Sequence, residues 1–462
     1  MSGSVDLGDP KLASRLRRES RIRRLSTIPL LANRYGKVYW VFDLQQGDGG
    51  KGAIVDSLAS SASVTMRCQG GDNAGHTSIF GVDGGFRKLE LRLLPSGLRH
   101  PHIVGVIAGG VLVNLEVLRS EIQEIGLHLE NRLRISDRCH VILPLHRRLD
   151  RQREDQLSIR GNQLGTTRRG IGPASVSKVA RIGLRMCDLN SKATIEDIIA
   201  QNVDFFNLES STVKENLEWV DRYRESLLPY VDDTDHLLDA ILESNGSVVI
   251  EGAQGSLIDI ENGTYPYVTS TITQQASVSA GGGISFDKVT YRIGVLKIYQ
   301  TMVGEGPFVT EATTDEASAL RHAGGEFEHS DVLSRPRRCG WMDLVSAKWA
   351  VDINSCSGVI LTKLDVISAL KSFKVCVAYR NDVSNEVTAD YSPRILDWDS
   401  MVPMYLEFKS WRIEDLQVES FEALPSYVLD FIEFIEQYLC VPVVGVRIGP
   451  TDVDMIVRKG YL

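Results

Sequence analysis

The stretch Val38-Tyr-Trp-Val-Phe-Asp-Leu-Gln-Gln-Gly47-Asp-Gly-Gly-Lys-Gly52 joins an apolar, aromatic run to a glycine-rich turn. The run Val38–Phe42 has the composition of a buried β-strand. Apolar residues return at helical spacing in Ile54–Leu58, directly after the turn. This order of strand, glycine-rich turn and helix predicts an α/β fold with a ligand at the carboxyl end of the strand.

Outward from this stretch, further apolar runs end in polar or glycine-rich loops, and helical patterns lie between several of them. The runs are 247–250, 293–299, 358–361, 375–379 and 441–446. One helix is predicted over Leu115–Ile125, because Asn114 can cap its start and Gly126 can end it. Another is predicted over Leu429–Leu439. Strands that alternate with helices predict a mostly parallel central sheet flanked by helices.

The domain organisation follows from where the candidate site residues lie. They run from Gly47 to Pro450, which favours one large domain over the roughly three that 462 residues suggest. Residues 37–462 are therefore predicted to form a single domain. Residues 1–36 are predicted to be an arginine-rich N-terminal extension, either solvated or packed on the body as a short helix. Asp6, Asp9 and Glu19 argue against an organelle transit peptide.

Composition limits the classes of partner. Hydrophobic residues make up 43% and charged residues 24% of the chain, the ordinary balance of a globular protein. A net charge of −9 argues against nucleic-acid binding, and no apolar run approaches the roughly 20 residues that span a bilayer. Seven scattered cysteines without a C-x-x-C pair suggest neither a zinc site nor a disulfide framework. The sequence thus predicts a cytoplasmic protein with small-molecule partners.

The turn Gly47–Gly52 is a candidate phosphate-binding loop, because glycines let backbone N–H groups approach a phosphate and Lys51 adds a positive charge. Its spacing, and the absence of Ser or Thr after the lysine, exclude a Walker A loop. Taken alone, the motif is equally typical of a tight turn without a function. Asp48 adds chemistry, since an acid in a phosphate loop is repelled unless it binds a metal or moves a proton.

The segment Gln69-Gly-Gly-Asp-Asn-Ala-Gly-His-Thr77 is a second candidate loop. A lone histidine is more often a satisfied core or surface residue than a catalyst. His76 lies among small residues that let a ligand come close, and it can donate a hydrogen bond or a proton near neutral pH. The second loop therefore offers an acid–base group next to the first.

These two loops resemble the paired signature loops of the adenylosuccinate synthetase family. The resemblance continues in order through 94–98, 136–144, 165–173, 178–181, 251–255, 263–270, 303–308, 335–341 and 361–365. It covers the chain from about Lys37 onward, and many motifs in register are far more specific than any one of them. Within the first loop, Gly49 stands where the family usually has glutamate. The resemblance implies the fold of that family, one large α/β domain related to the P-loop NTPases.

The resemblance implies a two-step, GTP-dependent ligation. In the family, GTP phosphorylates the 6-oxygen of inosine monophosphate (IMP), and the amine of aspartate then displaces the phosphate. Asp48 resembles the base that takes the N1 proton of IMP, and His76 the group that stabilises charge on the transferring phosphoryl. Lys51 and Gln254 complete the expected catalytic set. Mg²⁺ is the expected cofactor, held by Asp48 and by the carbonyl of Gly75.

The same resemblance implies binding residues. IMP is expected to contact Asn73, Thr167, Arg181, Gln254 and Thr269. GTP is expected to contact Gly47, Gly50, Lys51, Gly52, Gly75, His76, Thr77, Arg337, Lys363, Asp365, Gly449 and Pro450. Arg181 matches an arginine that reaches into the neighbouring subunit, which implies a homodimer. Taken alone, each threonine is more typical of a cap or turn. For Lys363 and Asp365 the alternative is a surface ion pair, which is disfavoured because the two residues follow the carboxyl end of the buried run 358–361.

The largest departure from the family pattern lies in Glu328–Ser334, where the amino acid is expected to bind. Arg335 can still bind a carboxylate, but Val332 and Leu333 replace small or hydroxyl-bearing residues. Each donor missing from a buried carboxylate costs roughly 1–3 kcal/mol. Three functions therefore stay open: a ligase that uses aspartate, a paralogue that joins another amine in a specialised nucleoside pathway, and a catalytically silent GTP-binding regulator. Retention of Asp48 speaks against the regulator.

Overall fold

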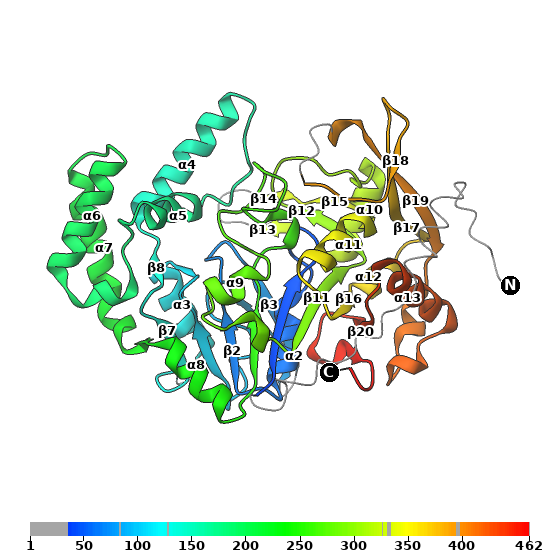
Figure 1. Cartoon of the computed structure of the whole chain (residues 1–462), viewed down its shortest axis with the longest axis horizontal. Helices are drawn as coiled ribbons and strands as arrows, with labels where there is room; N and C mark the ends of the chain where they lie inside the picture. The colour runs from blue at the N-terminus through cyan, green and yellow to red at the C-terminus, as the bar shows by residue number, and fades with distance from the viewer. Residues whose placement is uncertain are drawn as a thin grey trace.

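A wide, mostly parallel sheet runs through the centre of the molecule (Figure 1). The computed structural model describes residues 36–82, 85–126, 129–325, 327–329, 334–393 and 398–461, without the side chains of 327–329 and 334–336. In that part of the chain the sheet order is β21(Met455–Val457)-β20(Val443–Arg447)-β16(Gly358–Thr362)-β11(Tyr291–Lys297)-β1(Val38–Asp43)-β10(Val248–Glu251)-β2(Val64–Arg67)-β5(Val104–Ile107)-β7(Leu133–Ser136)-β9(Val231–Asp232). Neighbouring strands are parallel except β20 and β21, which confirms the predicted sheet.

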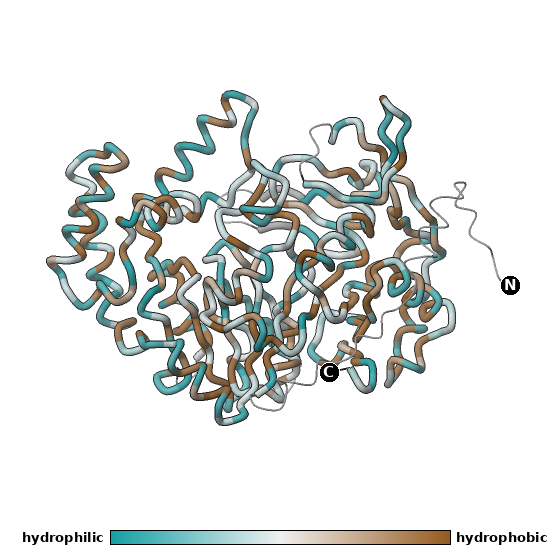
Figure 2. Tube along the Cα trace, viewed as in Figure 1, coloured by the Kyte–Doolittle hydropathy of each residue, from teal (hydrophilic) through white to brown (hydrophobic). Residues whose placement is uncertain are grey.

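Strand β1 lies in the middle of this sheet, and its side chains enter both hydrophobic cores. Val38, Trp40 and Phe42 pack into one core, whereas Val41 packs into the other. Successive side chains of a strand point to opposite faces, so a strand that is covered on both faces reads as one continuous apolar run. Figure 2 shows hydrophobic segments gathered along the central strands, with hydrophilic ones more frequent at the outer surface.

Helices cover both faces of the sheet. In the described residues they are α2(Lys51–Ala59), α3(Leu115–Ile125), α4(Pro144–Ile159), α5(Ile171–Val179), α6(Lys192–Phe205), α7(Ser211–Leu227), α8(Thr234–Glu243), α9(Ala276–Ala280), α10(Thr314–Gly324), α11(Leu344–Ile353), α12(Leu364–Ile367) and α13(Ser426–Leu439). The two predicted helices, α3 and α13, are confirmed. The Asn114 side chain accepts hydrogen bonds from two N–H groups at the start of α3, and Gly126 ends it with φ 65°. None of the helices in this part of the chain combines the length and the apolar composition needed to cross a membrane.

A second sheet lies at one end of the molecule, away from α6 and α7 (Figure 1). It contains β12(Tyr299–Met302), β15(Arg338–Asp343), β17(Ser372–Asn381), β18(Val387–Thr388) and β19(Met401–Lys409). The apolar run 375–379 therefore belongs to β17 in this sheet and is not a strand of the central one. The run 293–299 is also divided, because β11 ends at Lys297 and β12 begins at Tyr299. Burial alone predicts a strand without identifying its neighbours.

Short hairpins and ladders complete the fold. They are β3(His76–Val82) with β4(Gly85–Leu91), β6(Leu112–Val113) with β8(His140–Val141), and β13(Phe327–His329) with β14(Ser334–Pro336). The parallel strands β1, β2, β10, β16 and β20 all end at the same edge of the central sheet, so the loops after them lie together. This edge carries the site.

Candidate active site

A cavity of about 760 Å³ opens at the carboxyl edge of the central sheet, and most of the predicted site residues line it. Those in its wall are Gly47, Asp48, Gly50, Lys51, Gly52, Asn73, Gly75, His76, Thr77, Thr167, Gln254, Thr269, Arg337, Lys363, Asp365, Gly449 and Pro450. Its volume falls within the roughly 300–1,000 Å³ of typical small-molecule sites. The fold thus brings distant segments of the chain into one site, as the sequence predicts.

Asp48 lies at the tip of the first loop, in the left-handed conformation with φ 58°. Its side chain is 33% exposed, and its Oδ2 lies 3.4 Å from Nη1 of Arg337. Aspartate and asparagine tolerate this backbone conformation better than other residues with a Cβ. The carboxylate is therefore in the cavity, where a ligand can reach it, and beside a cation expected to bind GTP.

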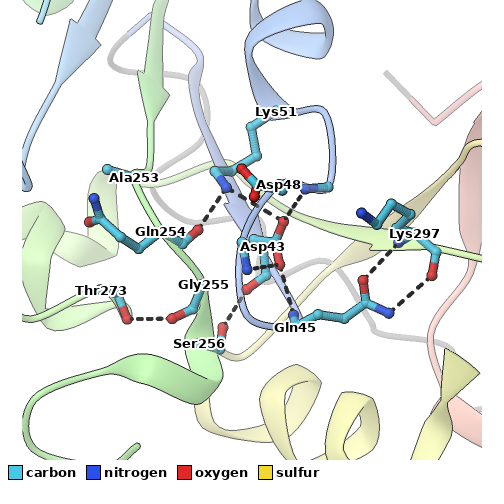
Figure 3. Close-up of polar contacts among 12 residues, drawn as sticks. Asp43, Gln45, Asp48, Lys51, Ala253, Gln254, Gly255, Ser256, Thr273 and Lys297 are labelled. Atoms are coloured by element: carbon cyan, nitrogen blue, oxygen red, sulfur yellow. Dashed lines mark hydrogen bonds and ion pairs between the residues drawn. The ribbon is translucent and has the colours of Figure 1, made fainter. Parts of the chain in front are cut away.

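Lys51 begins helix α2 and is almost fully buried. Its Nζ donates a hydrogen bond to the carbonyl of Gln254 at 2.7 Å and lies 3.5 Å from Oδ2 of Asp43 (Figure 3). These contacts hold the ammonium at the cavity wall. An ammonium has three donors, so Lys51 retains capacity to bind an anion while it is oriented by the protein.

His76 forms a buried pair with Glu251, the last residue of β10. Nδ1 of His76 and Oε1 of Glu251 are 2.5 Å apart, and both side chains are almost inaccessible to solvent. The Ser96 hydroxyl also donates to Oε1 at 2.6 Å, and its N–H donates to Oε2 at 2.9 Å. The carboxylate therefore fixes the ring, because Nδ1 must face it and Nε2 must face the other way.

Burial and charge act in opposite directions on the pKa values of His76 and Glu251. Burial lowers the pKa of His76, against the opposing charge of Glu251. Burial alone would raise the pKa of the Glu251 carboxyl, but the charge and hydrogen bond of His76, with the charge of Arg67, hold it well below its usual range. Burial thus favours the neutral imidazole, whereas the carboxylate of Glu251 favours the imidazolium. An anion near Nε2 would favour the imidazolium.

Gln254 follows the same strand, β10, and contacts the second loop. Its Nε2 donates to Oδ1 of Asn73 at 3.2 Å, and its backbone has φ 55°. Within the described residues its Oε1 is buried without a hydrogen-bond partner. Because buried polar atoms are rarely left unsatisfied, this oxygen is a candidate acceptor for a ligand donor.

Helix α4 contributes Asp150 and Glu154 to the wall of the cavity. Asp150 accepts from the N–H of Gly170 at 2.8 Å and from the Thr166 hydroxyl at 3.1 Å, while Glu154 accepts from the N–H of Gly165 at 2.6 Å. These bonds fix the loop that carries Thr167. Neither carboxylate belongs to a motif quoted above, so no local sequence signal identifies them.

Lys363 and Asp365 lie where β16 meets α12, at another part of the wall. Burial raises the pKa of the Asp365 carboxyl, although the charge of Lys363 opposes this shift. Arg447, at the end of β20, is nearly buried and donates to the carbonyls of Pro450 and Thr451 at 2.6 and 3.0 Å. The sequence predicted a surface ion pair as one alternative for Lys363 and Asp365; the two residues instead line a cavity.

Some predicted residues do not lie in this wall. Arg181 is exposed, with φ 66°, and is outside the cavity lining. Val332 and Leu333, expected near the amino acid, lie outside the described residues, and the side chain of Arg335 does too. Their expected roles stay predictions.

The structure adds two further carboxylates to the site. Asp43 ends β1 and Glu251 ends β10, so each follows a buried apolar strand. Such a position is itself a signal, because a charge directly after a buried strand needs partners. The partner of Glu251 is 175 residues away, however, and no local pattern identifies it.

Comparisons with known proteins point to one family. The family model described as adenylosuccinate synthetase matches residues 40–456. The chain is 40% identical to adenylosuccinate synthetase of Aquifex aeolicus over 91% of this chain and 97% of that one, and 38% identical to that of Haemophilus ducreyi over 92% and 100%. The solved structure of fully ligated adenylosuccinate synthetase from Plasmodium falciparum matches with a TM-score of 0.86 and 34% identity, over 92% of this chain and all of that one.

Proposed function

This chain belongs to the adenylosuccinate synthetase family, and we propose that the cavity at the edge of its central sheet performs the family reaction with Asp48, His76, Lys51 and Gln254. It is a GTP-dependent carbon–nitrogen ligase of purine biosynthesis that joins IMP to aspartate. The relatives give no support to the use of another amine or to a silent regulator. The convergence of Asp48, His76 and Gln254 in one cavity, with buried Glu251 bonded to His76, carries the assignment of the catalytic residues.

In the first step, Asp48 takes the proton from N1 of IMP as O6 attacks the γ-phosphorus of GTP. The bond between γ-phosphorus and the bridging oxygen breaks, and GDP leaves with that oxygen. Lys51 and His76 donate to the phosphoryl oxygens on which charge accumulates, and Glu251 stabilises His76 as an imidazolium. The products are 6-phosphoryl-IMP, GDP and a protonated Asp48.

In the second step, the amine of aspartate attacks C6 of the purine, and phosphate leaves with O6. The amine loses a proton as the carbon–nitrogen bond forms, and the product is adenylosuccinate. The unpartnered Oε1 of Gln254 supports a role for this residue in orienting the purine edge through both steps. Asn73, Thr167 and Thr269 lie in the same wall and are proposed to hold the nucleotide phosphate.

Mg²⁺ suits the groups at the centre of the cavity. Within the described residues there is no cluster of three or more His, Cys, Asp or Glu side chains that would hold a metal alone. Mg²⁺ usually binds through one or two carboxylates together with substrate phosphates, and the Asp48 carboxylate and Gly75 line the same cavity. We propose these two as its protein ligands. The ion would neutralise charge on the GTP phosphates.

Selection of GTP is proposed to depend on Asp365. A carboxylate accepts from both N1–H and the 2-amino group of guanine, and adenine offers neither donor. Lys363, Gly449 and Pro450 line the same part of the cavity, which supports their contact with the nucleotide. Arg337 and Thr77 are proposed to contact the phosphates, and Arg337 lies 3.4 Å from Asp48.

The function is tested by phosphate release from GTP. Release is expected only when Mg²⁺, IMP and aspartate are all present, with adenylosuccinate as the product identified by mass. A panel of other amino acids and amines, and ATP in place of GTP, serve as controls. Turnover restricted to another amine would replace aspartate in the assignment, and nucleotide binding without any turnover would contradict the enzyme function.

Arg181 supports a homodimer, because it is exposed and lies outside the cavity that its expected ligand occupies. We propose that it contacts IMP in the partner subunit. Arg181→Ala and Asp48→Asn are each expected to be nearly inactive as pure dimers. Mixing equal amounts should restore about a quarter of the wild-type rate, because half of the dimers are mixed and each mixed dimer has one intact site. No recovery after subunit exchange, verified by native mass spectrometry, would contradict action across the interface.

A further inference from the structure

The first loop has a shape that is set from inside by one carboxylate. Asp43, the last residue of β1, has no exposed side-chain surface. Its Oδ1 accepts hydrogen bonds from the N–H groups of Gln45 at 2.9 Å and Gly47 at 3.1 Å, and its Oδ2 accepts from that of Gly49 at 2.9 Å. Figure 3 shows this carboxylate enclosed by the loop, with Lys51 beside it.

Backbone N–H groups that converge in this way form an anion-binding concavity. Here a carboxylate of the chain occupies it, so these three N–H groups are already hydrogen-bonded without a bound phosphate. A nucleotide phosphate must therefore use other donors of the wall, such as the start of helix α2. This limits the expected role of Gly47: it lines the cavity, but its N–H is directed at Asp43.

The loop is also held from outside, at positions that flank Asp48. The side chain of Gln45 donates to the carbonyl of Lys297 and accepts from its N–H, at 3.0 and 3.2 Å. The hydroxyl of Thr362 donates to the carbonyl of Gly49 at 2.8 Å. Asp48 itself lies between two N–H groups bound to Asp43, so any relaxation there moves its carboxylate.

Gly49 and Asp43 are coupled sterically. A Cβ on Gly49 would lie 2.3 Å from Oδ2 of Asp43, which is closer than any real contact of this kind. The φ of Gly49 is outside the left-handed range, so its backbone does not by itself require glycine. Because the Asp43 carboxylate fills the space where a side chain would lie, position 49 requires glycine. The adenylosuccinate synthetase family usually has glutamate at this position.

We propose that Asp43 is a positioning residue of the reaction, whose buried carboxylate organises the loop and thereby fixes Asp48 and Lys51 in the cavity. The proposal rests on the function proposed above, because it concerns the placement of that catalytic set. It also accounts for the need for glycine at position 49. The loop is thus preorganised before nucleotide binds.

The first test is Asp43→Asn, which keeps the shape but turns an amide donor toward backbone donors. The kcat is expected to fall about 100-fold through misplacement of Asp48 and Lys51, while the KM for IMP changes less than threefold because its other contacts lie on different loops. A wild-type kcat, or a loss confined to the KM for IMP, would overturn the proposal.

The second test is a double-mutant cycle measured by thermal unfolding and GTP binding, not by turnover. Gly49→Ala alone is expected to lower both the unfolding temperature and the affinity for GTP. In an Asp43→Gly background, the same substitution should have less than half of that effect on each quantity. The matched control is Gly50→Ala: Gly50 has φ 91° and no neighbour within 4 Å of its Cβ position, so its cost should not depend on Asp43. Equal costs for Gly49→Ala in both backgrounds would overturn the coupling. Absence of turnover in the wild type would contradict the proposed function. The cycle would still test the coupling between Asp43 and Gly49, because it does not depend on turnover.

Discussion

Replacing Asp48 with asparagine is expected to lower kcat by about 1,000-fold while GTP and IMP still bind. Asparagine keeps the size of the side chain and tolerates the left-handed backbone at φ 58°, so the loop should keep its conformation. What is lost is the group that accepts the N1 proton. Rapid-quench measurement of 6-phosphoryl-IMP formation, with nucleotide affinities from calorimetry, separates the loss of chemistry from a loss of binding.

The matched control is Asp56→Asn on helix α2. This carboxylate is buried and pairs with Nε of Arg99 at 2.9 Å, away from the cavity lining. The control should lose stability and retain turnover per folded molecule. Normal turnover by the Asp48 variant would remove this residue from the role of the base, whatever the structure of the loop.

The carboxyl-edge site was predictable because its signals are local. The strand Val38–Phe42, the glycine-rich turn and the following helix lie within one short stretch, and their order places the turn at the end of β1. Asp48 could be singled out because an acid in a phosphate loop is repelled unless it binds a metal or moves a proton, and His76 because the small residues around it let a ligand come close. The cavity lining confirms that these residues lie together. Their catalytic roles stay predictions.

What the sequence could not predict depends on contacts across long separations. The run 375–379 has the composition of a buried strand, yet hydrogen-bond partners, not apolarity, decide that it pairs in the second sheet. Glu251 becomes meaningful only when β10 lies beside β2 and the loop after β2 brings His76 back to it. In the sequence, Asp43 is recognisable only as the residue after an apolar run. Its role becomes visible in the folded loop, where three backbone N–H groups donate to its carboxylate.

A second large effect is expected from Glu251→Gln, because this substitution removes the charge that stabilises His76 as an imidazolium. The negative charge of Glu251 raises the pKa of His76, so its loss lowers that pKa further. If the protonated ring stabilises the transferring phosphoryl, activity is lost as pH rises through this pKa. The variant should therefore lose activity at lower pH than the wild type, and its kcat near pH 7.5 should fall on the order of 100-fold. The deficit should shrink as pH falls below the pKa of His76 in the wild type.

A purely structural role for Glu251 predicts something else, and Glu121→Gln distinguishes the two. Glu121 is also a nearly buried glutamate, but its carboxylate accepts only from the N–H groups of Arg92, Leu93 and Leu94 among the described contacts. Its variant should unfold at lower temperature and keep the pH profile of the wild type. If Glu251→Gln lowers kcat by the same factor at every pH, the carboxylate holds the ring in place without tuning its charge. If the pH at which activity is lost shifts downward in Glu251→Gln but not in Glu121→Gln, Glu251 acts on the charge of His76.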